Sequence, residues 1–298
     1  MGDNPTKAVE LTAAEKALLV ERKATCPFIG SAVADGVLPV RNDANDPLAS
    51  IEDVRRLGNT GGGDLGDLLV LFASGNHAYM LGDSGKLDKR VPPGLFSLEL
   101  PGSQGSHPGH SGILQADPDI PNSGRLSEAD FARLTSRAKD GWIKRSEVGR
   151  FISENVLRDP KSRVLTKDTA ALLASDLGDL VQITGSVLLG KLSPSGEDAS
   201  RSRRDIEERL TKLLGEDNMV GSAGEFGLLF ALLANKPGTR KIDGEPAVAV
   251  ADLKAMFVDK HLPDGWGTWK KLRIDWVKNT LGLLVSAVKE YRTVKQTR

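Results

Sequence analysis

Cys26 is the only cysteine in the chain, and its residue type and sequence context make it the clearest candidate for a metal ligand. Pro27 follows it directly, and a short apolar run then leads to Gly36. Because proline is tolerated at the first position of a helix and glycine favours its end, this spacing predicts a helix with Cys26 as its N-cap. The helix dipole lowers the pKa of a sulfur at that position and favours the thiolate. Such a thiolate is suited to bind haem iron as an axial ligand.

Glu225 is the one carboxylate in an otherwise apolar run, residues 221–233. An apolar helix disfavours the charged form of a carboxyl group, which suits a general acid–base residue working near neutral pH. The alternative is a carboxylate in the first helical turn, where it stays solvated and interacts favourably with the helix dipole. The sequence permits both interpretations.

Two histidines, His107 and His110, lie in a stretch rich in glycine, proline, serine and aspartate, residues 82–125. That composition predicts a long irregular connection, and long ordered loops are commonly functional. Either histidine could belong to a site. Taken alone, each histidine is better explained as an ordinary loop residue that caps backbone carbonyl groups.

The order of these residues resembles the haem-thiolate peroxidases, the family of chloroperoxidases and unspecific peroxygenases. The first match is Cys26-Pro, an apolar stretch, and then Gly-x-Leu-Pro-x-x-Asn at 36–42. The second is Gly-Glu225 before an apolar run, followed by Leu-Pro at 262–263 and Gly-Trp at 265–266. The motif-bearing core covers about residues 24–270.

This resemblance implies an all-α, single-domain chloroperoxidase-like fold with long irregular loops. The whole chain, residues 1–298, would form one haem-binding domain, with 193–204 as a surface insertion and 289–298 as a tail that frays. The chain would be an enzyme, a haem-thiolate peroxidase or peroxygenase. It would use hydrogen peroxide to oxidise or oxygenate small apolar organic substrates.

The resemblance also implies haem b as the cofactor. Cys26 would bind the iron, and Pro27 and Phe28 would lie beside the cofactor. Glu225 would move a proton between the two oxygens of the peroxide, with His110, or less favourably His107, as the assisting histidine. The side chains expected to shape the substrate channel are Phe226, Leu229 and Phe230.

One motif of the family is incomplete in this chain. A Glu-His-Asp-x-Ser signature helps to hold magnesium beside a haem propionate, and here only the histidine matches. With His110 in register, Gly109 replaces the glutamate and Ser111 the aspartate. Because a hard cation prefers carboxylate oxygens, the sequence predicts that magnesium is weakly held or absent.

Two other functions fit parts of the sequence. The first is a calcium- or partner-binding helical protein with degenerate EF-hand-like loops, formed by residues 119–130 and 140–147. Both loops lack ligand oxygens at expected positions, so we favour a simpler interpretation in which Ser127 and Ser146 are helix N-caps. The second is a haem protein of the same fold that lacks peroxygenase activity.

The amino-acid composition excludes several classes of function and of binding site. The charges balance at 40 basic and 40 acidic residues, so no overall field attracts nucleic acid or an anionic membrane. One cysteine excludes an intrachain disulfide and a multi-cysteine zinc site. No apolar run approaches the roughly 20 residues that a membrane span needs. We find no secretory signal pattern at the start, and expect a cytoplasmic protein.

Hydrophobic periodicity and capping signals predict mainly helices. Thr12 and Glu15 form a candidate capping box, and Asp64 is a candidate N-cap. The helices are expected at 11–23, 27–35, 51–57, 65–80, 127–138, 146–157, 166–177, 206–214, 223–234, 250–260 and 267–291. Only residues 95–100 and 248–250 have weak strand patterns.

Overall fold

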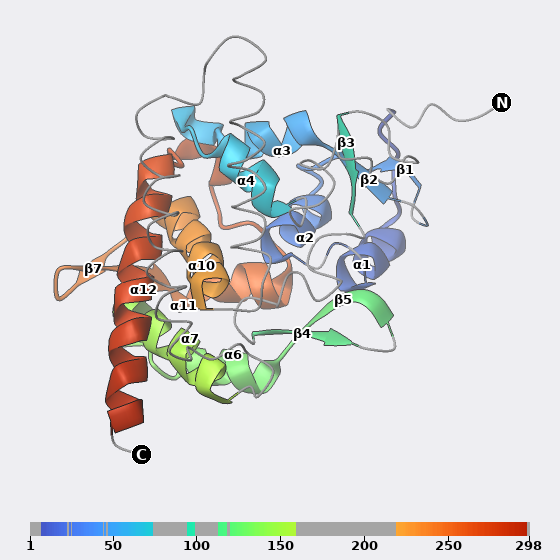
Figure 1. The fold of residues 1–298 in the computed structure, drawn as a ribbon. Coiled ribbons are helices and arrows are strands. Elements are labelled where there is room, and N and C mark those ends of the chain that lie inside the picture. Colours follow the sequence, from blue (N-terminus) through green and yellow to red (C-terminus); the bar gives the residue numbers. More distant parts are fainter. Residues whose placement is uncertain are drawn as a thin grey trace, which may run out of the picture.

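The chain is mostly helical with small sheets, as seen in a computed structural model (Figure 1). The structure describes residues 7–22, 24, 26–43, 45, 47–73, 94–98, 113–117, 120–158 and 219–296. Within these ranges, no helix has both the length and the apolar character needed to cross a membrane.

The helices follow one another along the chain with short strands between them. The α-helices are α1 (Ala13–Arg22), α2 (Pro27–Ala34), α3 (Ile51–Gly58), α4 (Gly66–Ala73), α6 (Glu128–Thr135), α7 (Arg145–Arg158), α10 (Met219–Leu233), α11 (Val250–Lys254) and α12 (Arg273–Gln296). Two 3-10 turns are η1 (Thr60–Gly62) and η3 (Trp266–Thr268), and a π-helix, η2 (Ala255–Asp259), continues α11.

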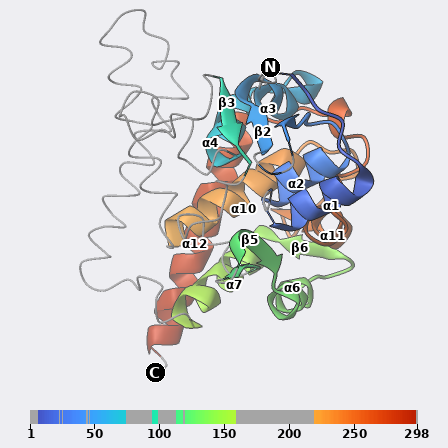
Figure 2. The same cartoon turned by 90° about the vertical axis from the view of Figure 1, so that its right-hand side faces the viewer.

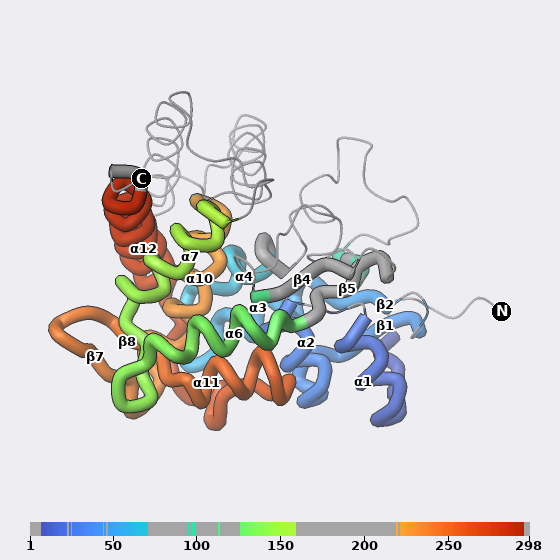
Figure 3. Tube along the Cα trace, turned by 90° about the horizontal axis from the view of Figure 1, so that it is seen from below, coloured from blue at the N-terminus to red at the C-terminus, as the bar shows by residue number. Residues whose placement is uncertain are grey.

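The long helix α12 runs along one side of the molecule, with α10 and α7 packed against it (Figures 1 and 2). Glycine permits the close approach of these helices. A Cβ on Gly227 of α10 would lie 2.0 Å from Thr280 Oγ1, and one on Gly149 of α7 would lie 2.5 Å from Ser286 Cβ. Figure 3 shows α1 and α2 at the opposite end of the molecule from α12.

Replacing Gly227 with alanine should therefore destabilise the protein. The added methyl group would also lie 3.0 Å from the Thr280 Cα atom, so the two helix backbones must move apart. Overpacking of this kind typically costs about 1–3 kcal/mol. Denaturant unfolding of Gly227→Ala should show a loss of this size. Gly267→Ala is the matched control, because a Cβ there meets nothing within 4 Å. Equal stability of the two variants would contradict this account of the packing.

Three small antiparallel sheets link the helices. The strands are β1 (Arg41–Asn42), β2 (Pro47–Ser50), β3 (Leu95–Ser97), β4 (Leu114–Asp117), β5 (Ile120–Leu126), β6 (Trp142–Lys144), β7 (Lys241–Ile242) and β8 (Glu245–Ala249). They pair in the orders β1-β2-β3, β4-β5 and β6-β8-β7. The two predicted strands are confirmed as β3 and β8. The expectation of an irregular connection over 82–125 is wrong for β4 and β5, whose backbones pair with each other.

Several predicted helix ends are confirmed by local hydrogen bonds. Thr12 and Glu15 form the expected capping box: the Thr12 N–H donates to Glu15 Oε2 at 2.8 Å, and the Glu15 N–H donates to Thr12 Oγ1 at 3.2 Å. Ser127 is the N-cap of α6 and accepts from the Asp130 N–H. Gly36 follows the end of α2 with a φ of 71°, the left-handed conformation that glycine adopts at helix ends.

Two predicted N-caps are wrong, and in both places a residue far along the chain makes a hydrogen bond at the helix start. Ser146 lies inside α7, and its N–H donates to Glu245 Oε2 at 3.1 Å. Asp64 does not cap the helix that follows it. Its carboxylate accepts from the Arg273 N–H at 2.7 Å, at the start of α12. Gly66, at the start of α4, donates to the Asn59 side chain at 2.6 Å.

The last helix also differs from its prediction. It starts at Arg273 rather than Gly267, because Trp269 is extended and the Lys271 carbonyl accepts hydrogen bonds from the Asp64 and Leu65 N–H groups. It continues to Gln296, so the predicted frayed tail is wrong for residues 289–296. The expected helices at 166–177 and 206–214, the insertion at 193–204 and the end of the helix at 65–80 lie outside the described residues.

Candidate functional site

Helix α2 positions Cys26 as the sequence predicts. Cys26 is the N-cap, with ψ of 123°, and its carbonyl accepts the first hydrogen bond of the helix from the Gly30 N–H at 2.7 Å. Residues 27–33 are all buried, so α2 lies inside the molecule and Cys26 packs against the core. The Phe28 ring contacts the Trp266 ring, with 5.1 Å between centroids.

Glu225 lies within α10 and not in its first turn. The helix begins at Met219, and the Glu225 side chain is 3% exposed. The alternative of a solvated first-turn carboxylate is therefore wrong. Glu225, Leu228, Leu229 and Leu232 follow the spacing i, i+3, i+4 and i+7, which places them on one face of the helix.

Two tryptophans hold α10 in place. The Trp276 Nε1–H of α12 donates to the Gly224 carbonyl at 3.0 Å, next to Glu225. The Trp269 Nε1–H donates to the Leu232 carbonyl at 2.8 Å, at the other end of the same face. The orientation of Glu225 is thus fixed by contacts made far along the chain.

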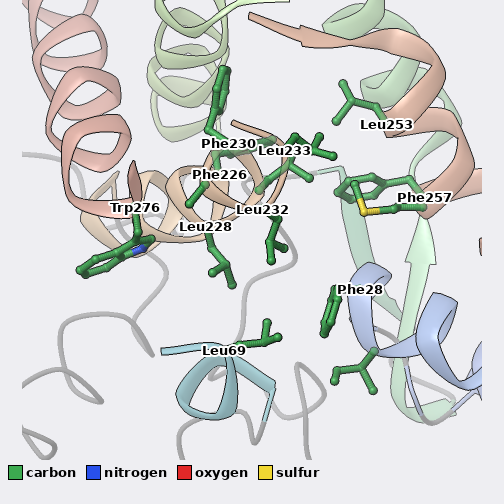
Figure 4. Close-up of a cluster of buried hydrophobic side chains, with 14 of the residues drawn as sticks. Phe28, Leu69, Phe226, Leu228, Phe230, Leu232, Leu233, Leu253, Phe257 and Trp276 are labelled. Atoms are coloured by element: carbon green, nitrogen blue, oxygen red, sulfur yellow. The ribbon is translucent and has the colours of Figure 1, made fainter. Parts of the chain in front are cut away.

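A cavity lies between the start of α2 and this face of α10. Its lining comes from α2, α4, α10 and η2, and its volume is about 30 Å³, room for a few water molecules, within a hollow of about 390 Å³ that includes open solvent. Figure 4 shows Leu228 and Leu232 of α10 directed toward Leu69 of α4, with Phe28 nearby. The lining residues are Cys26, Pro27, Phe28, Leu69, Glu225, Leu228, Leu229, Leu232, Met256 and Phe257.

The structure therefore brings Cys26 and Glu225 to one cavity, together with Pro27 and Phe28. Of the residues expected to shape a substrate channel, Leu229 belongs to the described lining, whereas Phe226 and Phe230 do not. These two phenylalanines lie on another face of α10, and the Phe226 ring packs edge-on against Phe151 of α7, 6.4 Å between centroids. The helical period gives the reason, because residues one position apart are turned about 100° from each other.

The protonation of Cys26 differs from the sequence expectation. Burial raises the pKa of the Cys26 thiol to about 11, because the thiolate is poorly solvated in the apolar cavity. The backbone amides of Ile29 and Phe28 favour the thiolate and lower the pKa, and the negative charge of Glu225 raises it further. The predicted lowering by the helix dipole is wrong for the protein without a ligand, because desolvation outweighs it.

The wall opposite α10 includes a π-helix that sequence reasoning missed. Met256 and Phe257 belong to η2, where the wider turn displaces the backbone from regular α geometry. The Ser31 hydroxyl of α2 lies 2.6 Å from the Pro27 carbonyl and 3.3 Å from the Met256 carbonyl, which links the Cys26 helix to η2. No local pattern distinguishes this π-helix from a continued α-helix, although such turns are frequent at functional sites.

The chemical types of the lining residues are those that a haem–thiolate site uses, but the space between them is smaller than a haem group, so the side chains of α2, α10 and η2 would have to move apart to admit one. Within the described residues no three of His, Cys, Asp and Glu lie close enough to hold a bare metal ion. The cavity instead offers one thiol, from Cys26, the thioether of Met256, apolar walls and one carboxylate across from the helix that Cys26 begins. A single thiolate in an apolar setting suits an iron that brings its four porphyrin nitrogens as ligands. Cys26 would supply the sulfur, with Phe28 and the α10 leucines in contact with the macrocycle.

Two further groups of predicted site residues remain, the histidines of the irregular connection and the acids of the EF-hand-like loops. His107, His110 and the eroded magnesium signature lie outside the described residues. In the first EF-hand-like loop the Asp130 carboxylate pairs with Arg158 at 2.7 Å and Arg133 at 3.0 Å. Burial opposes its ionisation, but hydrogen bonds from Arg158, Ser127 and Arg133 lower the pKa of Asp130.

The residues of the second EF-hand-like loop also make contacts within the protein. Its residues 142–144 form strand β6, which pairs with β8. Glu147 pairs with Arg150 at 2.9 Å and with Arg137 at 3.7 Å. Asp130 and Glu147 are thus engaged in ion pairs with arginines, an arrangement that does not favour calcium binding.

Comparisons with family models, with curated proteins and with solved structures found no match to this chain.

Proposed function

We propose that the protein is a haem-thiolate peroxidase or peroxygenase that uses hydrogen peroxide to oxidise or oxygenate small apolar organic molecules. The observation that carries this proposal is the meeting of Cys26 and Glu225 at one apolar cavity, although they come from opposite ends of the chain. The likeness of the motifs around these two residues to the haem-thiolate peroxidases led to the same pair. When bound, haem with a thiolate ligand supplies cleavage of the peroxide O–O bond and oxygen transfer.

The residues of the cavity have different roles in the proposed reaction. Cys26 would supply the sulfur ligand and would lose its thiol proton on binding, because a metal ligand must be deprotonated. Glu225 would accept a proton from one oxygen of hydrogen peroxide and return it to the other, so that water leaves and the remaining oxygen passes to the substrate. Leu69, Leu228 and Leu229 exclude water and offer an apolar surface to the substrate.

The ferrous–CO spectrum of the haem-loaded protein tests the proposal. The wild type should have the red-shifted Soret band of thiolate ligation. Because the chain has no other thiol, Cys26→Ala should lose that band. Its helical content, measured by circular dichroism, should stay at the wild-type level.

Met256→Leu is the matched control, since Met256 is the other sulfur-bearing residue in the lining and leucine keeps its apolar volume. This variant should retain the thiolate spectrum. A wild type that retains no haem after unbound haem is removed by gel filtration would refute the proposed function, and so would an unshifted band in the wild type.

A further inference from the structure

The cavity lies between two walls that are braced separately. Helix α10 forms one wall, and it packs against α7 and α12. Helix α2 and η2 belong to the other wall and are tied to each other. The Ser31 hydroxyl of α2 lies 3.3 Å from the Met256 carbonyl of η2, and the Leu262 N–H, just after η2, donates to Asp35 Oδ2 at 2.7 Å. The width of the cavity therefore depends on how the two walls are held against each other.

A hairpin joins the two walls along the chain. It comprises residues 234–249, and it leads from the end of α10 to the start of α11, which η2 continues. Its strand β8 pairs with β6 so that Ile143 lies opposite Val248, and the Val250 N–H donates to the Gly141 carbonyl at 2.9 Å. In EF-hand calcium sensors, a change in the angle between two helices joined by a loop opens an apolar groove. Helices α10 and α11 are joined in the same manner, so a change in the angle between them would widen the cavity.

An ion pair connects the two helices beside this hairpin. The Nζ of Lys236, just after α10, donates to Asp252 Oδ1 of α11. The two side chains are 22% and 10% exposed, so salt screens the pair only weakly. Lys236 stands four residues after Leu232, and Asp252 stands four residues before Met256, and both Leu232 and Met256 line the cavity. The ion pair therefore joins the two walls about one helical turn from the cavity.

The small volume of the cavity gives this ion pair a role. At about 30 Å³ the cavity has room for a few water molecules, so a larger molecule enters only when the walls separate. We propose that the Lys236–Asp252 ion pair is a latch that holds α10 and α11 together and so limits the size of the molecules that reach Cys26 and Glu225. This control of size goes beyond the proposed function, because it does not depend on which molecule the cavity binds.

The reactivity of Cys26 tests this proposal, because Cys26 lines the cavity and is the only cysteine in the chain. The probes are methyl methanethiosulfonate and the bulkier benzyl methanethiosulfonate, which modify a thiol by the same reaction. Both reagents need the thiolate, so a change in the thiol pKa cancels in the ratio of the two rates. The wild type should prefer the methyl reagent much more strongly than free cysteine does.

Asp252→Asn should reduce that preference by about 10–100-fold, the factor by which a hydrogen bond between charged groups shifts an equilibrium. The rate with the benzyl reagent should rise because the walls separate more often. Asparagine keeps the shape of the side chain, and Lys236 is exposed enough to turn toward water, so no unpaired charge stays buried. The variant should therefore keep the tryptophan fluorescence of the folded wild type.

Two matched variants should keep the wild-type preference. Lys236→Arg retains a positive partner for Asp252. Asp259→Asn removes an acid from an exposed ion pair with Lys254, 3.3 Å apart, in which both residues belong to the same wall.

A wild-type preference in Asp252→Asn would overturn the inference, and so would a wild type whose preference equals that of free cysteine. An equal loss of preference in Asp252→Asn and Asp259→Asn would also contradict it, because the effect would then not be specific to the latch. Since neither reagent involves haem, failure of the latch and failure of the proposed function give different results.

Discussion

Glu225→Gln should react with hydrogen peroxide about 10²–10⁴-fold more slowly than the wild type, the usual contribution of a general acid–base residue. Glutamine preserves the size of the side chain and its place among the leucines of α10, but it cannot take up the peroxide proton. Glu225 is 3% exposed and lines the same cavity as Cys26. Water therefore cannot easily replace its carboxylate as the group that accepts the peroxide proton. Stopped-flow mixing of haem-loaded protein with peroxide measures the rate as the resting haem spectrum disappears.

Two controls make this result specific. The resting spectrum of Glu225→Gln should match the wild type, because Glu225 is not proposed as an iron ligand. Glu128→Gln, which alters an exposed acid at the start of α6, should react at the wild-type rate. If Glu225→Gln also reacted at that rate, Glu225 would have no acid–base role. A wild type that binds haem through Cys26 but reacts as slowly as the variant would indicate a haem protein of this type without peroxide chemistry.

Lys271→Ala should lower the free energy of unfolding by about 2–5 kcal/mol, the range seen when a long buried side chain is truncated to alanine. Lys271 is fully buried. Its Nζ donates to the Trp266 carbonyl at 2.6 Å and the Trp269 carbonyl at 3.0 Å, and lies 4.2 and 4.3 Å from the centroids of the two indole rings. Truncation leaves both carbonyls without this donor and opens a cavity between the rings. Chemical denaturation, followed by tryptophan fluorescence, measures the loss.

The same side chain makes the stability depend on pH. Burial lowers the pKa of Lys271 to about 8, from 10.5 in the unfolded chain. Between these values the unfolded state holds more protons than the folded state, so the contribution of Lys271 to stability grows as the pH rises from about 8 to 10.5. Lys271→Met fills the same space without titrating. The stability of the wild type relative to Lys271→Met should therefore rise across this interval, and a flat or falling difference would contradict the prediction.

Features set by a few neighbouring residues could be predicted from the sequence. The start of α2 at Pro27, the Thr12–Glu15 capping box and the Ser127 cap all depend on hydrogen bonds within four positions. The apolar run around Glu225 likewise predicted a helix there, although the sequence left open whether Glu225 stands in its first turn. Such signals are local, so the order of the residues contains them.

Features that depend on partners far along the chain could not be predicted in this way. Asp64 is a good local N-cap, but it accepts from Arg273, which begins α12. The end of the last helix was also missed, because α12 gains its stability from packing against α7 and α10. Helical stability comes mainly from such packing and only in part from local propensity.

The sequence by itself determined that Cys26 begins a helix and that Glu225 belongs to an apolar helical run, and the structure decided that Glu225 lies in the buried interior of that helix. Only the tertiary structure decided that both side chains reach one cavity, because this depends on the rotation of α10 that Trp276 and Trp269 impose. It also decided the protonation of Cys26: burial at the meeting of α2, α10 and η2 raises the thiol pKa, and the helix dipole is too weak to offset the loss of solvation.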